Sequence, residues 1–309
     1  MANNVLISGR TGFVGSNLFN YLKKDYRVQG VSRRKAEDLI SYESLDKEVL
    51  NISKAFIHLA GKAHDLKSIS NDDEYFKVNT ELTKKLFDKF LKSECEAFIF
   101  MSSVKAVADE VEAVLVENVT PNPITAYGKS KLEAEEYILS KEIPKDKRVY
   151  ILRPCMIHGP NNKGNLNLLY SFVSKGIPYP FGRFKNQRSF LSVENLCFVI
   201  KELIENKNIS SGVYNIADDE SLSTNELVKI IGVGVNKNAR IFNTPKVFIN
   251  MLAKLGDILL PFPINSERVQ KLTEDYVVSN KKIKSALGID EFPLSIREGI
   301  IKTIKSFSE

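Results

Sequence analysis

Three glycines at a regular spacing constrain the fold of this chain more than any other feature of its sequence. Gly9, Gly12 and Gly15 form a G-x-x-G-x-x-G pattern between a short apolar run, residues 5–8, and an amphipathic run, residues 14–24. Glycine at these points lets the backbone turn sharply and approach a pyrophosphate, whose charge a helix N-terminus attracts. The pattern predicts a phosphate-binding loop between a strand and a helix; the alternative is an ordinary strand-to-helix turn.

Short apolar runs alternate with amphipathic runs through the first half of the chain. This alternation is typical of a parallel sheet whose strands are joined by helices. We expect strands at residues 5–8, 27–31, 55–59, 97–102 and 149–153, with helices at 14–24, 78–92 and 127–140 among the connections. The sequence therefore predicts an α/β fold with a doubly wound, Rossmann-like parallel sheet.

The alternation of apolar and amphipathic runs ends after Pro160. A polar loop at residues 161–165 is followed by Gly176, Pro178, Pro180 and Gly182. A chain of 309 residues has room for two domains. We expect a dinucleotide-binding domain at residues 1–160 and a smaller C-terminal substrate domain at 161–309, with residues 190–217 able to return and pack on the first.

Charge and cysteine usage narrow the class of protein. The 44 Lys and Arg residues against 38 Asp and Glu leave a net charge of +6, and both signs are interspersed, unlike the clustered charge of a nucleic-acid binder. Cys95, Cys155 and Cys197 show no metal-ligand or CxxC spacing, which favours a reducing compartment. The N-terminus has no signal-like leader, and charges and prolines interrupt the apolar stretch 247–264. We expect a cytoplasmic protein without a nucleic-acid or membrane partner.

The end of the second predicted strand bears on the choice of dinucleotide. Ser32, Arg33 and Arg34 stand where an NAD-dependent dehydrogenase usually has an acid for the ribose 2′-hydroxyl. Guanidinium groups instead suit a 2′-phosphate, and Arg10 of the glycine loop can join them. We expect NADP(H) in preference to NAD(H); the alternative is a solvated run of charge that tolerates either cofactor.

Tyr127 and Lys131 form a Y-x-x-x-K pair that lies on one face of a helix. A nearby ammonium favours the phenolate, so we expect it to lower the tyrosine pKa. Tyr137 and Lys141 repeat the spacing but are rotated off this face, so we expect Tyr137 to be a packing or surface residue. Ser103 follows the predicted strand 97–102 and can complete a Ser, Tyr and Lys proton relay; the alternative is that it only caps the strand.

None of the three histidines is predicted to be a catalytic residue or a metal ligand. His58 lies within an apolar strand, and we expect a core histidine with satisfied hydrogen bonds. His64 and His158 have no ligand spacing with each other or with the cysteines, so no metal is predicted. No G-x-S-x-G motif surrounds Ser103, which argues against a hydrolase triad.

With these residues in place, the chain resembles the extended short-chain dehydrogenase/reductase family over essentially its whole length. Within that family it is similar to the nucleotide-sugar epimerases and reductases related to UDP-glucose 4-epimerase. The stretches that carry the resemblance are SGRTGFVG (8–15), HLAGKAH (58–64), FMSSVK (100–105), AYGKSKLEAE (126–135), LRPCMIHGPNNKGNLNLL (152–169) and RSFLSVENL (188–196).

The resemblance implies further site residues. The nicotinamide side of the cofactor would be lined by Leu59, Ala60, Gly61 and Asn79. Tyr127 and Lys131 would also contact the cofactor, with Lys131 holding the nicotinamide ribose. The predicted cofactor site thus also includes Gly9, Arg10, Thr11, Gly12, Phe13, Val14, Gly15, Ser32, Arg33 and Arg34. A UDP-sugar would contact Ser103, Asn165, Leu166 and Phe181, with Arg188 and Arg268 on its diphosphate; the alternative for either arginine is a surface ion pair. The family pattern also implies a homodimer through helices 78–92 and 127–140.

Departures from the family patterns bear on the reaction. The related 4,6-dehydratases carry an Asp-Glu pair where this chain has Val104 and Lys105, which argues against dehydration. Ordinary 4-epimerases generally have an acidic residue at the position of Ser32 and an Asn at the position of Cys155. They also have an acidic residue at the position of Lys271. We therefore expect a 4-keto reductase acting on a UDP-linked hexose in 2-acetamido-2,6-dideoxy sugar synthesis. A UDP-glucose or UDP-GlcNAc 4-epimerase and a non-catalytic NADPH-sensing regulator are the alternatives.

Overall fold

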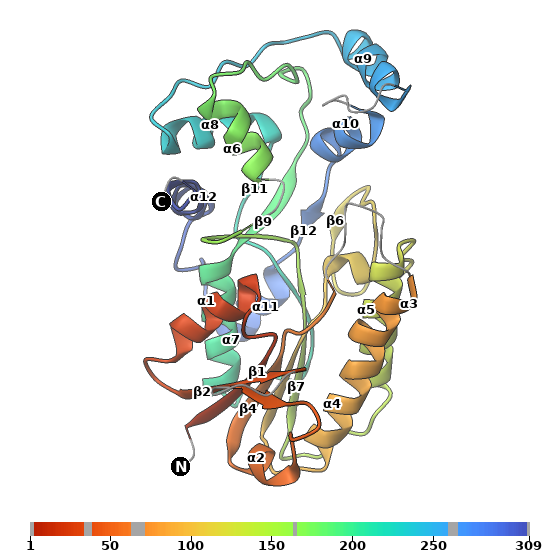
Figure 1. Ribbon diagram of the computed structural model, residues 1–309, viewed down its shortest axis with the longest axis vertical. Helices are drawn as coiled ribbons and strands as arrows, with labels where there is room; N and C mark the ends of the chain where they lie inside the picture. The colour runs from red at the N-terminus through yellow and green to blue at the C-terminus, as the bar shows by residue number, and fades with distance from the viewer. Residues whose placement is uncertain (1–2, 34–38, 63–71, 163–165, 259–264, 308–309) are drawn as a thin grey trace.

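A parallel β-sheet forms the centre of the molecule. The computed structural model describes residues 3–33, 39–62, 72–162, 166–258 and 265–307, so Arg34, His64 and Asn165 lie outside the described residues. In the described part, seven strands pair side by side in parallel. Their order is β10 (Gly212–Ile216), β7 (Arg148–Pro154), β5 (Ala97–Met101), β4 (Ser53–His58), β1 (Asn4–Ser8), β2 (Arg27–Ser32) and β3 (Leu39–Ser41). The predicted doubly wound α/β fold is confirmed (Figure 1).

Helices cover both faces of this sheet, because alternate strand residues point to opposite sides. Val5 and Ile7 pack in the same apolar cluster as residues of α1 (Phe13–Leu22) and α7 (Val193–Glu205). Leu6 packs in the cluster of α4 (Leu82–Leu91) and α5 (Ala126–Leu139), on the side of the short helix α2 (Lys47–Asn51). Strands buried on both faces explain the continuous apolar runs in their sequences.

The predicted helix 78–92 is wrong in its first turn. After α3 (Asp72–Tyr75), residues Phe76–Glu81 form a π-helix, η1, and the regular α4 begins only at Leu82. Extra residues of this kind in a helix often mark functional positions. Asn79 lies within this π-turn and is fully buried.

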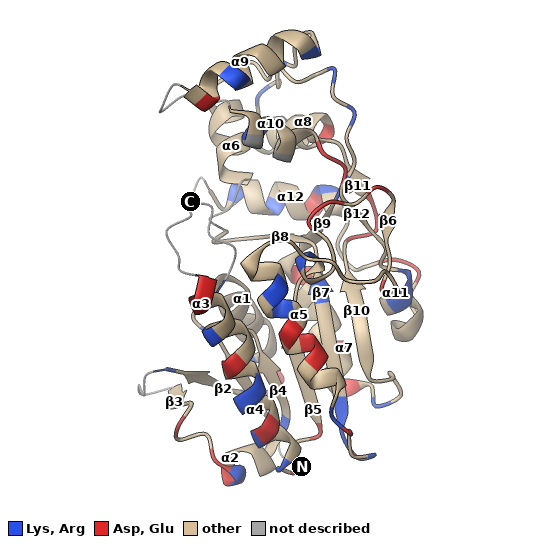
Figure 2. Cartoon of the chain, turned by 90° about the vertical axis from the view of Figure 1, so that its right-hand side faces the viewer, with Lys and Arg blue, Asp and Glu red and all other residues tan. Residues whose placement is uncertain are grey.

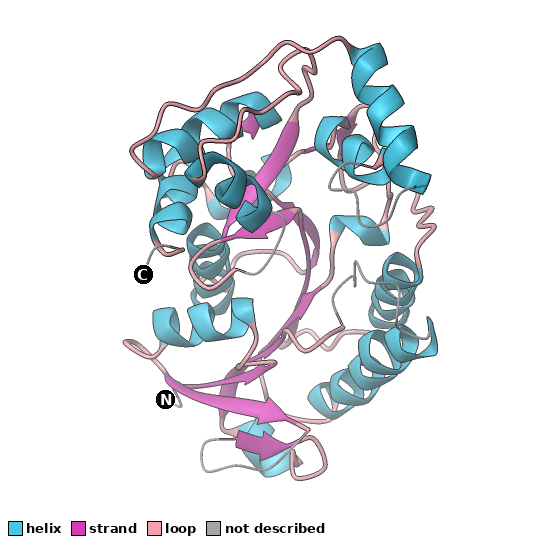
Figure 3. Ribbon diagram, turned by 45° about the horizontal axis from the view of Figure 1, so that its top comes forward, coloured by secondary structure: helices cyan, strands magenta, loops and turns pink. Residues whose placement is uncertain are grey.

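A second lobe has its own apolar cluster. Its elements are β8 (Met156–His158), α6 (Leu166–Ser174), β9 (Arg188–Ser192), β11 (Ser221–Leu222), α8 (Thr224–Gly234), α9 (Lys246–Ile258), α10 (Ser266–Thr273) and α12 (Ile296–Lys305). Four short elements pack in the apolar cluster of the central sheet instead: η2 (Val104–Ala106), β6 (Val114–Leu115), β12 (Val277–Val278) and α11 (Lys281–Leu287). Of these, η2 follows β5, and α11 packs on β10. Figure 3 shows the helices of the lobe gathered at the end away from the N-terminus.

The surface carries both signs of charge. In Figure 2 the positions of basic and acidic residues are intermixed along α4 and α5. Across the described ranges, no helix has both the length and the apolar character that crossing a bilayer requires.

Candidate active site

The glycine loop has the geometry of a phosphate cradle. Gly9 has a φ of +73°, and its carbonyl accepts a hydrogen bond of 3.0 Å from the Gly12 amide. A Cβ at Gly15 would lie 2.2 Å from the Gly9 carbonyl oxygen, so only glycine fits there. Gly12 precedes α1 without a side-chain cap, which leaves the first amides of the helix for a ligand. The loop therefore fits the pyrophosphate of a dinucleotide.

The arginine of the glycine loop lies beside the second strand. A Cβ at Gly30 of β2 would approach the Arg10 side chain to 3.0 Å, and the Arg10 guanidinium lies 4.5 Å from the centre of the Phe19 ring. Arg33 is exposed directly after Ser32, the last residue of β2. Two of the three predicted phosphate-binding arginines thus occupy the same edge of the sheet.

The segment after β4 meets the π-turn and the helix α5. A Cβ at Gly61 would lie 3.0 Å from both Asn79 Oδ1 and Lys131 Nζ, so these three residues converge. Asn79 Oδ1 accepts from the Lys62 amide at 2.8 Å, and its Nδ2 donates to Ser130 Oγ at 3.0 Å. Residues far apart in the sequence therefore enclose one point at the carboxyl end of the sheet.

The two hydroxyls predicted to act together lie close to each other. Tyr127 lies in the first turn of α5, which Thr125 caps by accepting from the Gly128 amide. Ser103 follows β5, and its side chain lies near enough to the Tyr127 hydroxyl to favour the phenolate and so oppose a rise in the tyrosine pKa. Ser103 Oγ also accepts from the Lys105 amide at 3.2 Å, so it caps η2 as well. The capping interpretation of Ser103 is thus observed, and its place in a proton relay stays a prediction.

The expected effect of Lys131 on Tyr127 is wrong. Burial raises the pKa of Tyr127, and the nearby Ser103 hydroxyl opposes that rise only in part. The Lys131 ammonium instead donates to the Met101 carbonyl at 2.8 Å. Burial lowers the pKa of Lys131 to about 8, an effect that the Glu135 carboxylate opposes. At neutral pH the site therefore holds a protonated phenol beside a buried ammonium.

A buried ion pair beneath this site was not predicted from the sequence. Glu135, one turn after Lys131, accepts from Arg153 Nε at 3.1 and 3.0 Å and from the Ser102 hydroxyl. Glu135 is 1% exposed and Arg153 is 5% exposed. The available signal was the spacing of four between Lys131 and Glu135, but the partner strand β7 could not be inferred from spacing.

The second tyrosine–lysine pair lies elsewhere, as the rotation along the helix predicts. The Tyr137 hydroxyl donates to Asp88 of α4 at 2.7 Å, and the Lys141 ammonium lies 4.3 Å from the centre of the Tyr137 ring. Tyr137 joins two surface helices and is separate from the glycine loop.

His58 is a core histidine, as predicted. The Ala60 amide donates to Ser8 Oγ, the Ser8 hydroxyl lies 2.6 Å from His58 Nδ1, and His58 Nε2 lies 2.9 Å from Thr83 Oγ1. The Thr83 hydroxyl donates to the Asn79 carbonyl, so His58 must be the neutral Nε2–H tautomer. Burial lowers the pKa of His58 to about 3. Among the described residues, no group of three or more histidine, cysteine or acidic side chains could hold a metal ion.

The predicted sugar-nucleotide residues are spread over the second lobe. Leu166 and Phe181 are 4% and 5% exposed in its apolar cluster, so their side chains mainly pack the core. Arg188 begins β9 and lies 3.3 Å from Glu274 in an ion pair. Arg268 is exposed on α10. A ligand in this lobe would meet Leu166 and Phe181 chiefly through their main chain.

The parallel sheet, the glycine cradle and the Ser-Tyr-Lys group define a dinucleotide-binding protein of the extended short-chain dehydrogenase/reductase class. The family described as NAD dependent epimerase/dehydratase matches residues 5–217, and the chain belongs to that family. It is thus a member of the group of nucleotide-sugar epimerases and reductases.

Individual relatives cover nearly the whole chain. The UDP-glucose 4-epimerase of Vibrio cholerae is 31% identical over 99% of this chain and 96% of its own length. The GDP-6-deoxy-D-mannose reductase of Pseudomonas aeruginosa is 25% identical over 75% and 80% of the two chains. The structure of MoeE5 in complex with UDP-glucuronic acid and NAD has a TM-score of 0.75 at 22% identity over 99% of each chain. RMD from Pseudomonas aeruginosa complexed with NADPH has a TM-score of 0.73 at 20% identity over 98% of each chain.

Proposed function

We propose that this protein is an NADP(H)-dependent reductase of a UDP-linked 4-keto hexose, acting in 2-acetamido-2,6-dideoxyhexose synthesis for surface polysaccharide. The observation that carries the proposal is the position of Tyr127 beside Ser103 at the carboxyl end of the sheet, where burial raises the pKa of the phenol above its ordinary value. Reduction of a ketone needs a proton donor at the oxygen, and a phenol kept protonated by burial is suited to that role.

The predicted site residues have separate roles in binding the cofactor, donating the proton and binding the sugar nucleotide. The glycine loop would hold the pyrophosphate, Arg10, Arg33 and Arg34 the 2′-phosphate, and Gly61 and Asn79 the nicotinamide side. The dihydronicotinamide of such a cofactor would supply the hydride for C4. Tyr127 gives its proton to the 4-oxygen, and Ser103 keeps that oxygen within hydrogen-bond reach. The Lys131 ammonium, which also donates to the Met101 carbonyl, would hold the nicotinamide ribose. Arg188 and Arg268 would hold the diphosphate, with Asn165, Leu166 and Phe181 around the sugar nucleotide.

The second candidate is a UDP-glucose or UDP-GlcNAc 4-epimerase, favoured by the 31% identity with a UDP-glucose 4-epimerase. Epimerisation starts by removing a proton from the 4-hydroxyl, which requires the phenolate. The raised pKa of Tyr127 makes that form scarce at neutral pH and so favours the reductive direction. Known structures of this fold bind either NAD or NADPH. The third candidate, a regulator without turnover, would have no need of the Ser103–Tyr127 contact.

A single assay separates the candidates. A UDP-4-keto-6-deoxy sugar with NADPH should consume cofactor in proportion to product, whereas an epimerase would interconvert UDP-GlcNAc without added cofactor. Tyr127→Phe should abolish either reaction. Tyr137→Phe is the matched control, because its hydroxyl lies on the same helix but donates to Asp88 of α4. Full activity in Tyr127→Phe would refute the catalytic assignment; absence of turnover on all these substrates would favour the regulator.

We further propose a homodimer through α4 and α5, a cytoplasmic location, and a sugar-nucleotide-binding domain at residues 161–309, with a dinucleotide-binding domain at 1–160. The return of β10 to the central sheet and of α7 to α1 supports assigning part of 190–217 to the first domain. Sedimentation of the purified protein tests the dimer.

A further inference from the structure

Helix α9 presents two apolar faces. Ile249, Ala253 and Gly256 are buried on the side that faces the lobe. Val247, Met251, Leu255 and Ile258 recur at helical spacing on roughly the opposite side, where Val247 is 82% and Ile258 is 78% exposed. Phe248, 48% exposed, widens this outer face. A helix of a water-facing surface normally exposes polar residues there, so this face is suited to an apolar environment.

Cations gather at the start of the same helix. A cavity of about 600 Å³ is lined by Gly182, Arg183, Lys185, Asn243, Pro245, Lys246 and Val247. Its lining includes three cationic side chains and no carboxylate. In the part of the chain that the structure describes, Arg183, Lys185 and Lys246 form no ion pair within 4.0 Å. Lys254 adds an exposed cation farther along α9.

The position of α9 leaves this surface accessible. Figures 1 and 2 show the helix at the outer end of the second lobe, away from the central sheet. α10 packs against it on the inner side. A partner on the outer face would therefore leave the glycine loop and Tyr127 uncovered.

We propose that α9 and the Arg183, Lys185 and Lys246 cavity form a docking surface for an anionic membrane. The outer apolar face of α9 enters the boundary between headgroups and acyl chains, and the cavity takes a lipid phosphate. Interfacial helices combine these same two features, an apolar face and flanking basic residues. The surface lies on the bilayer without crossing it, since α9 has only 13 residues.

Charge argues against a second copy of the chain as the occupant. In a two-fold dimer the same patch meets itself, and its cavity lining offers no carboxylate to pair with the three cations of the other copy. The expectation from the sequence, that no membrane is a partner, rested on the absence of a spanning segment. The outer apolar face of α9 could bind a membrane from one side, and a search for spanning segments does not detect such a face. The inference is independent of the proposed reaction.

Vesicle sedimentation tests the proposal with the full chain. We expect binding to vesicles of equal parts phosphatidylcholine and phosphatidylglycerol, weaker binding to phosphatidylcholine alone, and a decline as salt is raised. Val247→Ser with Ile258→Ser, and separately Lys185→Glu with Lys246→Glu, should each weaken binding at least about tenfold.

The matched controls are Ile52→Ser, an exposed apolar residue near the opposite end of the molecule, and Lys145→Glu, an exposed cation outside the second lobe. Both should bind like wild type, and circular dichroism should show all variants folded. Unchanged vesicle binding in both α9 variants would overturn the proposal. So would a lack of vesicle binding combined with self-association that the α9 variants abolish, because α9 would then be an interface between copies.

Discussion

Lys131 and Tyr127 lie one helical turn apart, and burial shifts their pKa values in opposite directions. It lowers the pKa of Lys131 to about 8 and raises that of Tyr127 above its ordinary value of 10.0. As pH rises above about 8, the lysine loses its charge while the phenol keeps its proton. The proposed reduction needs both groups protonated. Its rate should therefore follow the titration of Lys131.

We expect kcat/KM for reduction to fall as pH rises through about 8. The measurement is a pH profile with saturating NADPH. Lys131→Arg should be slower, because the guanidinium cannot reproduce the contact with the Met101 carbonyl, yet its profile should lack this fall since arginine stays charged. A wild-type profile that stays level well beyond pH 8 would contradict the assignment.

Glu135 controls the same site from beneath. Glu135→Gln leaves Arg153 buried without a counter-charge, which should destabilise the protein by about 3 kcal/mol. The loss of the carboxylate also removes the influence that raises the pKa of Lys131, so the fall in the pH profile should move to lower pH. Denaturant unfolding measures the first effect and the pH profile the second. A purely structural role would change stability and leave the profile in place.

His58 makes the stability of the fold pH-dependent. Its pKa is about 3 in the folded chain against 6.5 in the unfolded chain, so between these values only the unfolded state binds the proton. The free energy of unfolding should decrease as pH falls below about 6.5, by up to about 1.4 kcal/mol per unit. His58→Leu should be less stable at neutral pH but should lose less stability on acidification. Equal acid dependence of both proteins would contradict this.

At the scale of elements, the sequence predicts what periodicity can encode. All five expected strands belong to the sheet, because burial on both faces requires continuous apolar runs. β3, with three residues, is too short for such a signal. The π-turn η1 could not be predicted, because the helical periodicity of this stretch comes from Leu82, Leu86 and Phe90 of α4. These residues give no sign of the wider turn that precedes them. Ser103 and Tyr127 could be placed from their positions at a strand end and a helix start. The hydrogen bond from the Lys131 ammonium to the Met101 carbonyl could not be predicted. It depends on how β5 and α5 pack together, which no local sequence pattern specifies.

The glycine loop permits a direct test of an element. In Gly15→Ala the new Cβ would meet backbone atoms at 2.2 and 2.8 Å, so the loop must shift, at a cost of about 1–3 kcal/mol. NADPH affinity, measured by fluorescence titration, should fall at least about tenfold. Gly288→Ala is the matched control, because its φ of +68° causes strain but nothing lies within 4 Å. It should lose about 1 kcal/mol of stability and retain NADPH affinity. Equal affinity losses would contradict the cradle.

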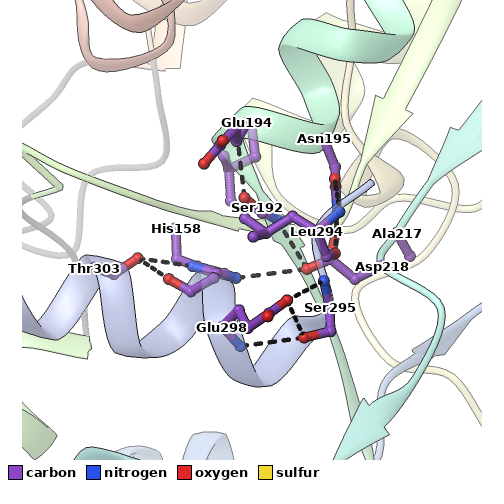
Figure 4. A network of polar contacts seen from close by, with 12 residues as sticks. His158, Ser192, Glu194, Asn195, Ala217, Asp218, Leu294, Ser295, Glu298 and Thr303 are labelled. Carbon is purple, nitrogen blue, oxygen red and sulfur yellow. Dashed lines mark hydrogen bonds and ion pairs between the residues drawn. The ribbon is translucent and has the colours of Figure 1, made fainter. Parts of the chain in front are cut away.

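At the scale of the whole molecule, one carboxylate connects the sheet to the second lobe (Figure 4). Asp218, just beyond β10, accepts from the Ser192 amide at 2.9 Å and from Asn195 Nδ2 at 2.8 Å. His158 Nε2 lies 3.6 Å from it, and His158 Nδ1 lies 3.0 Å from Thr303 Oγ1 of α12. The buried Asp218 thus links the end of a sheet strand with β8, β9, α7 and α12.

Removing this carboxylate should affect one lobe more than the other. Asp218→Ala leaves the buried Ser192 and Asn195 donors without their acceptor, which should cost about 3 kcal/mol in denaturant unfolding. Because Arg188 is at the start of β9 and Ser192 at its end, we expect UDP affinity to fall several-fold more than NADPH affinity when both are measured by calorimetry. Asp219→Ala is the control, since its neighbouring, more exposed carboxylate contacts Lys284 and the Phe292 amide. If Asp218→Ala lowered both affinities equally, or destabilised the protein no more than Asp219→Ala, the carboxylate would not be coupling the lobes.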